Sequence, residues 1–107
     1  MVEARSKGLI VTTEFILLEL GNACARAEDH KDFVTLVESL RASPRATIVT
    51  LNTALLERGL KLFKERKDKD WSLTDCISFV VMKDEGIHEA LTGDQHFEQA
   101  GFAALLK

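Results

Sequence analysis

The sequence contains few of the residues that mark several large protein classes. Its 107 residues include one proline, two cysteines and no tyrosine. Cys24 and Cys76 stand far apart and form no CxxC motif, which argues against a disulfide or zinc pair and favours two buried, reduced thiols. No apolar run approaches the roughly 20 residues that span a bilayer. The opening segment MVEARSK lacks the apolar core of a signal peptide, so we expect a cytoplasmic protein with no membrane partner.

The sequence also lacks a net positive charge. The formal net charge is −3, whereas a protein that binds nucleic acid through a broad basic face is normally positive. Five cations nevertheless gather at Lys61, Lys64, Arg66, Lys67 and Lys69. Favourable placement near a helix C-terminus together with solubility explains this cluster most simply. Contact with an RNA backbone is the alternative.

Hydrophobic spacing predicts strands that alternate with helices. We expect strands at 9–12, 46–51, 89–92 and 102–106, and helices at 14–27, 29–41, 53–67 and 73–85, with residues 1–7 as the end of a helix. Strands that alternate with helices of ten or more residues favour parallel connections. The expected fold class is therefore α/β: a three-layer α/β/α sandwich with a small parallel sheet, in one domain over residues 1–107.

Capping residues define several of the predicted helix ends. Thr13, Asn52 and Ser72 are expected N-caps, and Gly86 is expected just past the end of the helix at 73–85. The helix at 14–27 is apolar nearly all round, which predicts burial. In the helix at 53–67, the inner face is assigned to Leu56, Leu60 and Phe63. Trp71 is interpreted as a packing residue rather than a platform for base stacking.

Three carboxylates are the candidate site residues. Glu19 interrupts an apolar helix, which is costly unless it is paired or binds a cation, although it could simply mark a thin exposed edge. Asp75 follows Ser72 by three positions, a capping-box pattern that could by itself explain both residues. Asp94 follows the strand at 89–92, where α/β sheets bind ligands, or it is a turn residue after glycine. His96 could approach this site, but a surface or packing role is favoured.

The three carboxylates share one metal chemistry. They are hard oxygen donors, which suit Mg²⁺ or Mn²⁺ better than zinc or copper. Divalent ions held by carboxylates can activate water for phosphodiester hydrolysis. Such an ion would also offset the charge of a phosphate, which an acidic protein cannot do with a basic face.

Three segments together resemble the PIN domains of VapC-type toxins. They are VTTEFILLELGNA, DKDWSLTDCISFVVMKDEGIHEALTGDQHF and QAGFAALL, and their order and spacing agree along essentially the whole chain. The resemblance implies a metal-dependent endoribonuclease with Glu19, Asp75 and Asp94 as catalytic Mg²⁺ or Mn²⁺ ligands, supported by Ser72 and Thr74. It also implies an RNA substrate, a cognate antitoxin protein and a homodimer or swapped oligomer.

One part of the family pattern is absent from this sequence. The family begins with a central strand that ends in the first metal-binding aspartate, and nothing before Leu9 resembles it. We therefore expect weak metal binding, and a sheet closed either by re-pairing or by a partner chain. The alternative function is a degenerate, non-catalytic PIN fragment that acts as an antitoxin- or protein-binding module.

Overall fold

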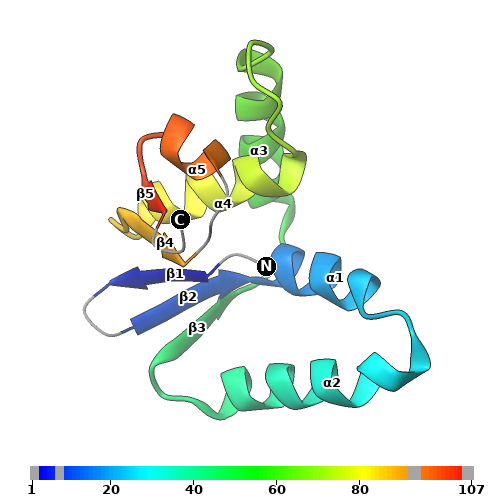
Figure 1. The fold of residues 1–107 in the computed structure, drawn as a ribbon. Coiled ribbons are helices and arrows are strands. Elements are labelled where there is room, and N and C mark those ends of the chain that lie inside the picture. The colour runs from blue at the N-terminus through cyan, green and yellow to red at the C-terminus, as the bar shows by residue number, and fades with distance from the viewer. Residues whose placement is uncertain (1–2, 7–8, 92–94, 105–107) are drawn as a thin grey trace.

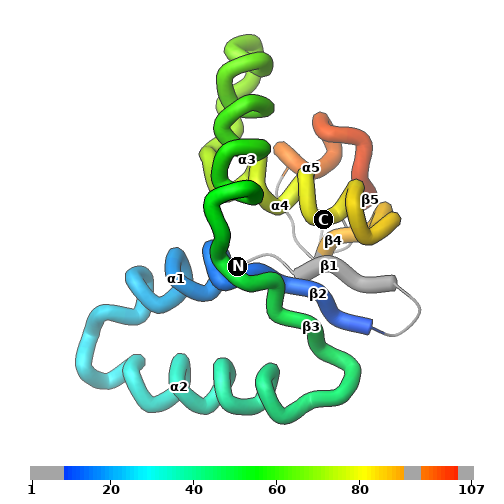
Figure 2. The backbone as a smooth tube through the Cα atoms, turned by 180° about the vertical axis from the view of Figure 1, so that it is seen from behind, coloured from blue at the N-terminus to red at the C-terminus, as the bar shows by residue number. Residues whose placement is uncertain are grey.

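The computed structural model describes residues 3–6, 9–91 and 95–104. Its strands are β1 (Glu3–Ser6), β2 (Leu9–Thr13), β3 (Ala46–Val49), β4 (Glu89–Leu91) and β5 (Ala103–Ala104). Its helices are α1 (Glu14–Ala23), α2 (Ala27–Ala42), α3 (Thr53–Glu65), α4 (Leu73–Asp84) and α5 (Gln95–Gln99). Figure 1 shows α2 on one side of the sheet and α3, α4 and α5 on the other, and Figure 2 shows the same layers from behind. The predicted α/β fold class is confirmed.

The sheet has the order β3-β2-β1-β4-β5, with one strand reversed. The β2–β3 and β4–β5 pairs are parallel, as predicted. Strand β1 lies between β2 and β4 and is antiparallel to both, with Ala4 opposite Val11 on one side and Ala90 on the other. The expected helix end at residues 1–7 is therefore wrong for Glu3–Ser6, because these residues form the central strand instead. The sheet is closed by re-pairing, one of the two solutions that the sequence predicted.

The predicted caps are observed at the described helix ends. The Thr13 side chain accepts a hydrogen bond from the Ile16 N–H, and the Asn52 side chain accepts one from the Leu55 N–H. Gly86 follows α4 with a positive φ of 66°, a conformation that favours glycine at this position. The helix predicted at 14–27 is too long, since α1 ends at Ala23 and α2 begins at Ala27. Helix α5 was not predicted.

The core is built around α4. Its buried side chains pack with residues from β2, α3, β4, α5 and the C-terminal segment. On α3, the residues nearest α4 are Leu55 and Gly59, which are buried, whereas Leu60 and Phe63 are exposed. The inner face predicted from Leu60 and Phe63 is therefore wrong. A Cβ added to Gly59 would lie 2.4 Å from the Ile77 Cγ1, so a glycine permits this close helix approach, which side-chain spacing alone does not reveal.

Helix α1 is less buried than its composition predicted. Ile16 and Leu17 are buried, but Leu18 is 59% exposed. The two cysteines are unpaired, as expected, with Cys76 buried and Cys24 half-buried. In the part of the chain that the structure describes, no helix has the length and apolar character needed to cross a membrane.

Candidate active site

The candidate site lies at the edge of the sheet where the strands end. Because β1 is antiparallel to both neighbours, β2, β3, β4 and β5 all run in the same direction. The carboxyl ends of β2 and β3 meet directly, since the Leu51 N–H donates a 2.6 Å hydrogen bond to Glu14 Oε1. Such edges are where α/β sheets bind ligands. The loops that follow β2 and β3 thus come together, whereas residues 92–94, which follow β4, lie outside the described residues.

Asp75 is fixed in the first turn of α4 by neighbours on two elements. Its Oδ2 accepts the Ser72 N–H at 3.1 Å, and its own N–H donates to Ser72 Oγ at 3.0 Å. This reciprocal pair is the capping box that the sequence predicted. The same Oδ2 lies 3.1 Å from His96 Nδ1 on α5. Since a carboxylate oxygen can only accept, Nδ1 carries the proton in this contact.

His96 lies beside a candidate metal ligand, which was the less favoured of the two placements weighed from the sequence. A surface or packing role was favoured, yet His96 contacts the candidate ligand Asp75 across 21 positions of sequence. Both side chains are largely enclosed, with 25% of His96 and 15% of Asp75 exposed. The only advance signal was the place of His96 two residues after Asp94, because no local pattern links it to the start of α4.

The supporting residues stabilise the first turn of α4. Ser72 caps the helix, and the Thr74 carbonyl accepts a 2.9 Å hydrogen bond from the Ser78 hydroxyl. The Thr74 backbone is thus tied to the next turn of α4. The Asp75 carboxylate contacts Ser72 and His96 through Oδ2, and within the described residues no hydrogen bond engages Oδ1. One oxygen of Asp75 is therefore available to a ligand.

Glu19 occupies an exposed position on α1, a helix that contacts α4. Across residues 3–6, 9–91 and 95–104, no group of three histidine, cysteine or acidic side chains is arranged to hold a metal ion. Asp94 lies outside those residues, so the joint site of Glu19, Asp75 and Asp94 remains a prediction. The contact between His96 and Asp75 joins the start of α5 to the first turn of α4.

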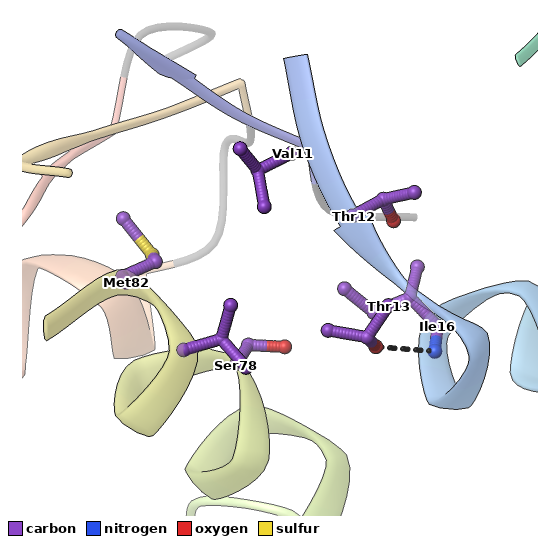
Figure 3. Close-up of a pocket in the computed structure, with 7 residues that line it drawn as sticks. Val11, Thr12, Thr13, Ile16, Ser78 and Met82 are labelled. Carbon is purple, nitrogen blue, oxygen red and sulfur yellow. Dashed lines mark hydrogen bonds between the residues drawn. The ribbon is translucent and has the colours of Figure 1, made fainter. Parts of the chain in front are cut away.

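A small cavity separates the end of β2 from α4 (Figure 3). Val11, Thr12 and Thr13 line one wall, and Ser78 and Met82 line the opposite wall. Its volume is about 10 Å³, which is room for no more than about one water molecule. The Thr13 hydroxyl oxygen is occupied as the cap of α1. A substrate therefore cannot bind inside this cavity.

The donor chemistry of the site is that of oxygen ligands. Burial raises the pKa of the Cys76 thiol, and the negative charge of Asp75 raises it further. The thiol therefore stays protonated and is a poor metal ligand. Carboxylate oxygens are the ligands that Mg²⁺ and Mn²⁺ prefer, so Asp75 Oδ1 and Glu19 fit a hard divalent ion better than zinc.

Comparisons with known proteins agree with the observed fold and identify the family. A search of curated protein sequences found no match. The crystal structure of Mycobacterium tuberculosis VapC20, described as a toxin that cleaves the sarcin–ricin loop, has the same fold with a TM-score of 0.80. The two sequences are 24% identical, and the alignment covers 94% of this chain and 76% of VapC20. The PIN domain family matches residues 2–103. The chain therefore belongs to the PIN domain family.

Proposed function

We propose that this protein is a metal-dependent endoribonuclease of the VapC toxin type, which hydrolyses RNA phosphodiesters. The observation that carries the proposal is the Asp75 carboxylate, enclosed at the carboxyl edge of the sheet with one oxygen held by Ser72 and His96. Membership of the PIN family and the fold shared with VapC20 support the same activity. An RNA substrate in the cytoplasm follows from it.

Glu19, Asp75 and Asp94 would together hold the Mg²⁺ or Mn²⁺ ion. When bound, such an ion lowers the pKa of a water molecule and neutralises charge on the phosphate. Ser72 and His96 orient the Asp75 carboxylate through Oδ2, which leaves Oδ1 to a ligand. Thr74 contributes backbone order through its bond from Ser78. The enclosed position of Asp75 keeps this orientation against competing water.

Replacing Asp75 with asparagine tests the proposal. Asp75→Asn keeps an acceptor for the Ser72 N–H but removes the charge, so folding should persist while cleavage falls by about 100-fold or more. The control is Asp32→Asn on α2, at an exposed position, which should cleave like the wild type. The assay follows a labelled RNA with Mg²⁺ or Mn²⁺ and again with EDTA. Cleavage that survives both EDTA and Asp75→Asn would refute the proposal.

A non-catalytic binding module is the second candidate, and the direction of β1 favours it. Because β1 is reversed, its carboxyl end at Ser6 lies at the edge opposite the ends of β2 and β4. The carboxyl end of β1 therefore cannot bring an aspartate to the candidate site. The family pattern places its first metal-binding aspartate there, at the end of the central strand. Titration with Mn²⁺ separates the two functions. Strong thermal stabilisation by micromolar metal supports the nuclease, and its absence supports the binding module.

Partners form a further part of the proposal. A small antitoxin protein is the natural inhibitor of a VapC-type toxin, and a homodimer or swapped oligomer is the expected assembly. The exposed apolar side chains Leu18 on α1 and Val34 on α2 offer surface for such contacts. Light scattering on the purified chain tests the assembly, because a stable monomer at high concentration would exclude both forms.

A further inference from the structure

The connection between α3 and α4 forms a hollow that carries an unusual concentration of positive charge. Residues 61–69 hold five of the chain's 14 lysines and arginines but only two of its 17 acidic residues. The remainder of this acidic protein is correspondingly more negative. Since like charge elsewhere repels a polyanion, any phosphate-bearing ligand is directed to this segment.

The hollow itself has a volume of about 470 Å³. Its walls include Arg66, Lys67 and Lys69, opposed by one acid, Asp70. Its aromatic surface comes from Phe63, which is 47% exposed, and from Trp71, which is buried. Cations beside an exposed aromatic ring are the combination that binds single-stranded RNA, through its phosphates and by stacking on a base.

The cations of the hollow differ in how they are engaged. The Arg66 guanidinium lies 4.9 Å above the Trp71 ring and pairs with Asp68 at 3.0 Å. Lys67 and Lys69 form no close ion pair within the described residues, although the charge of Lys69 helps to lower the pKa of Asp68, so both ammonium groups can contact a ligand. Arg66 therefore forms part of the wall of the hollow, whereas Lys67 and Lys69 provide the positive charge that attracts a phosphate.

The hollow borders the first turn of α4 at Cys76. Cys76 contributes to its lining and directly follows Asp75 in the first turn of α4. A chain of nucleotides held along the α3–α4 connection would thus be delivered to the turn that carries the candidate metal ligand. A protein with a net charge of −3 depends on such local clusters of cations to contact a phosphate backbone.

We propose that this hollow, lined by Phe63, Arg66, Lys67 and Lys69, binds the single-stranded RNA that flanks the cleaved phosphodiester. The inference rests on the proposed ribonuclease function and adds a substrate-binding surface to it. Lys67 and Lys69 contact phosphates, and Phe63 stacks against a base. The logarithm of the RNA affinity falls linearly with the logarithm of the salt concentration. For single strands, each lost phosphate contact reduces the steepness of this slope by about 0.7.

The test is RNA binding by the double variant Lys67→Glu/Lys69→Glu. Fluorescence anisotropy with a labelled 12-nucleotide single strand in EDTA measures affinity without cleavage. We expect a loss of at least tenfold and a salt slope lower by about 1.4, the value for two lost phosphate contacts on a single strand, whereas Lys67→Arg/Lys69→Arg retains affinity. The matched control Lys31→Glu/Arg41→Glu on α2 makes the same change in net charge and should stay within threefold of the wild type.

Phe63→Ser gives an independent measure, because this exposed side chain can be shortened without opening the core. We expect a three- to tenfold loss of affinity at unchanged melting temperature. Wild-type RNA affinity in the lysine variant, or an equal loss in the α2 control, would overturn the proposal. So would a lysine variant that keeps RNA affinity but loses binding to polyglutamate, since the hollow would then accept an acidic protein segment.

The RNA-binding surface and the nuclease activity can be refuted by different results. A wild-type chain that binds RNA through the hollow but never cleaves it with Mg²⁺ or Mn²⁺ would refute the proposed nuclease and leave the binding surface standing. A chain that cleaves RNA while the lysine variant binds with full affinity would refute the surface alone.

Discussion

The two halves of the chain are packed to very different degrees. Among the residues that the structure describes, the main buried cluster has twelve members, and only Val11 comes from the first 50 residues; the others are Leu55, Trp71, Cys76, Ile77, Phe79, Val81, Met82, Ile87, Ala90, Phe97 and Phe102. Both halves expose some large apolar side chains, Leu9, Leu18 and Val34 in the first and Leu51, Leu60 and Phe63 in the second, so the difference lies in the buried cluster. A rigid C-terminal half thus holds Asp75 in one orientation, while a looser N-terminal layer carries Glu19 on an exposed face.

This difference matters for the site, since its two described carboxylates come from opposite halves. Asp75 has a capping partner and a histidine, and no such bond is recorded for Glu19 among the described residues. We infer that ligand binding orders the Glu19 side more than the Asp75 side. The predictions below compare matched changes in the two halves.

The largest expected effect is on stability at the centre of the aromatic cluster. Phe97 is fully buried and packs edge-on against Phe79, with ring centroids 4.7 Å apart. Phe97→Ala should lower the free energy of unfolding by about 3–5 kcal/mol. Phe33→Ala, at a half-buried position on α2, should lower the free energy of unfolding by clearly less. Urea denaturation measures both, and equal losses would show that the halves are packed alike.

Next in size is the effect of removing the histidine beside Asp75. His96→Ala should reduce RNA cleavage by about 10- to 100-fold, the usual cost of losing a residue that orients a metal ligand. Asn22→Ala, one turn beyond Glu19, should reduce it much less. Restoration of part of the activity by His96→Asn, which can still donate to Asp75, would distinguish orientation from simple packing. An unchanged rate in His96→Ala would show that Ser72 alone orients the carboxylate.

A smaller effect is expected from two helical glycines, one in each half. Alanine gains about 1 kcal/mol of helix propensity at either position. At Gly59 its Cβ would lie 2.4 Å from Ile77 Cγ1, and relieving such overlap costs about 1–3 kcal/mol. At Gly21 the nearest atom is the Phe33 ring at 3.0 Å, which can shift. Gly59→Ala should therefore destabilise the protein and Gly21→Ala should not, as thermal unfolding would reveal.

The smallest effect concerns exposed ion pairs. Arg58 and Asp84 join α3 to α4 through two hydrogen bonds, and this bonding to Arg58 lowers the pKa of Asp84 from 3.8. A carboxyl group whose pKa is lowered by folding stabilises the folded state at pH values above its pKa in the unfolded chain. This stabilisation disappears as the pH falls through its pKa in the folded protein. Asp84→Asn should thus be slightly less stable at pH 7 and equal to the wild type near pH 2.

The matched change in the N-terminal half is Glu28→Gln, which removes the local Arg26–Glu28 pair. Because both partners lie on the same short stretch of chain and are largely exposed, no change in stability is expected at either pH. A difference between Asp84→Asn and the wild type that persists in acid would contradict the electrostatic explanation.

Sequence reasoning succeeded where local chemistry decides structure. Thr13, Asn52 and Ser72 cap helices because their side chains accept bonds from the nearest N–H groups, and these contacts span three residues. The β2–β3 and β4–β5 pairs followed from the alternation of strands and helices. The acidic residues and their metal were derived from context and from the PIN resemblance, and the joint site still awaits measurement.

Features that depend on distant partners could not be foreseen. Strand β1 is only four residues long, and its place is set by pairing with β2 and β4 rather than by its own pattern. The contact between His96 and Asp75 joins two helices. The break after α1 carries no glycine or proline at Cys24 to mark it. Exposure of Leu60 and Phe63 depends on how α3 rotates to bring Gly59 against Ile77.

The reversed central strand has a practical consequence for handling the protein. Among the strands that the structure describes, β1 alone joins the β2–β3 pair to the β4–β5 pair by hydrogen bonds, so trimming it would split the sheet into two ribbons. Since β1 runs against its neighbours, its amino end lies at the edge where β2 and β4 finish. Any peptide fused ahead of Glu3, such as an affinity tag, would emerge beside the candidate site and could obstruct RNA there. Recombinant versions are better tagged elsewhere, or cleaved before assay.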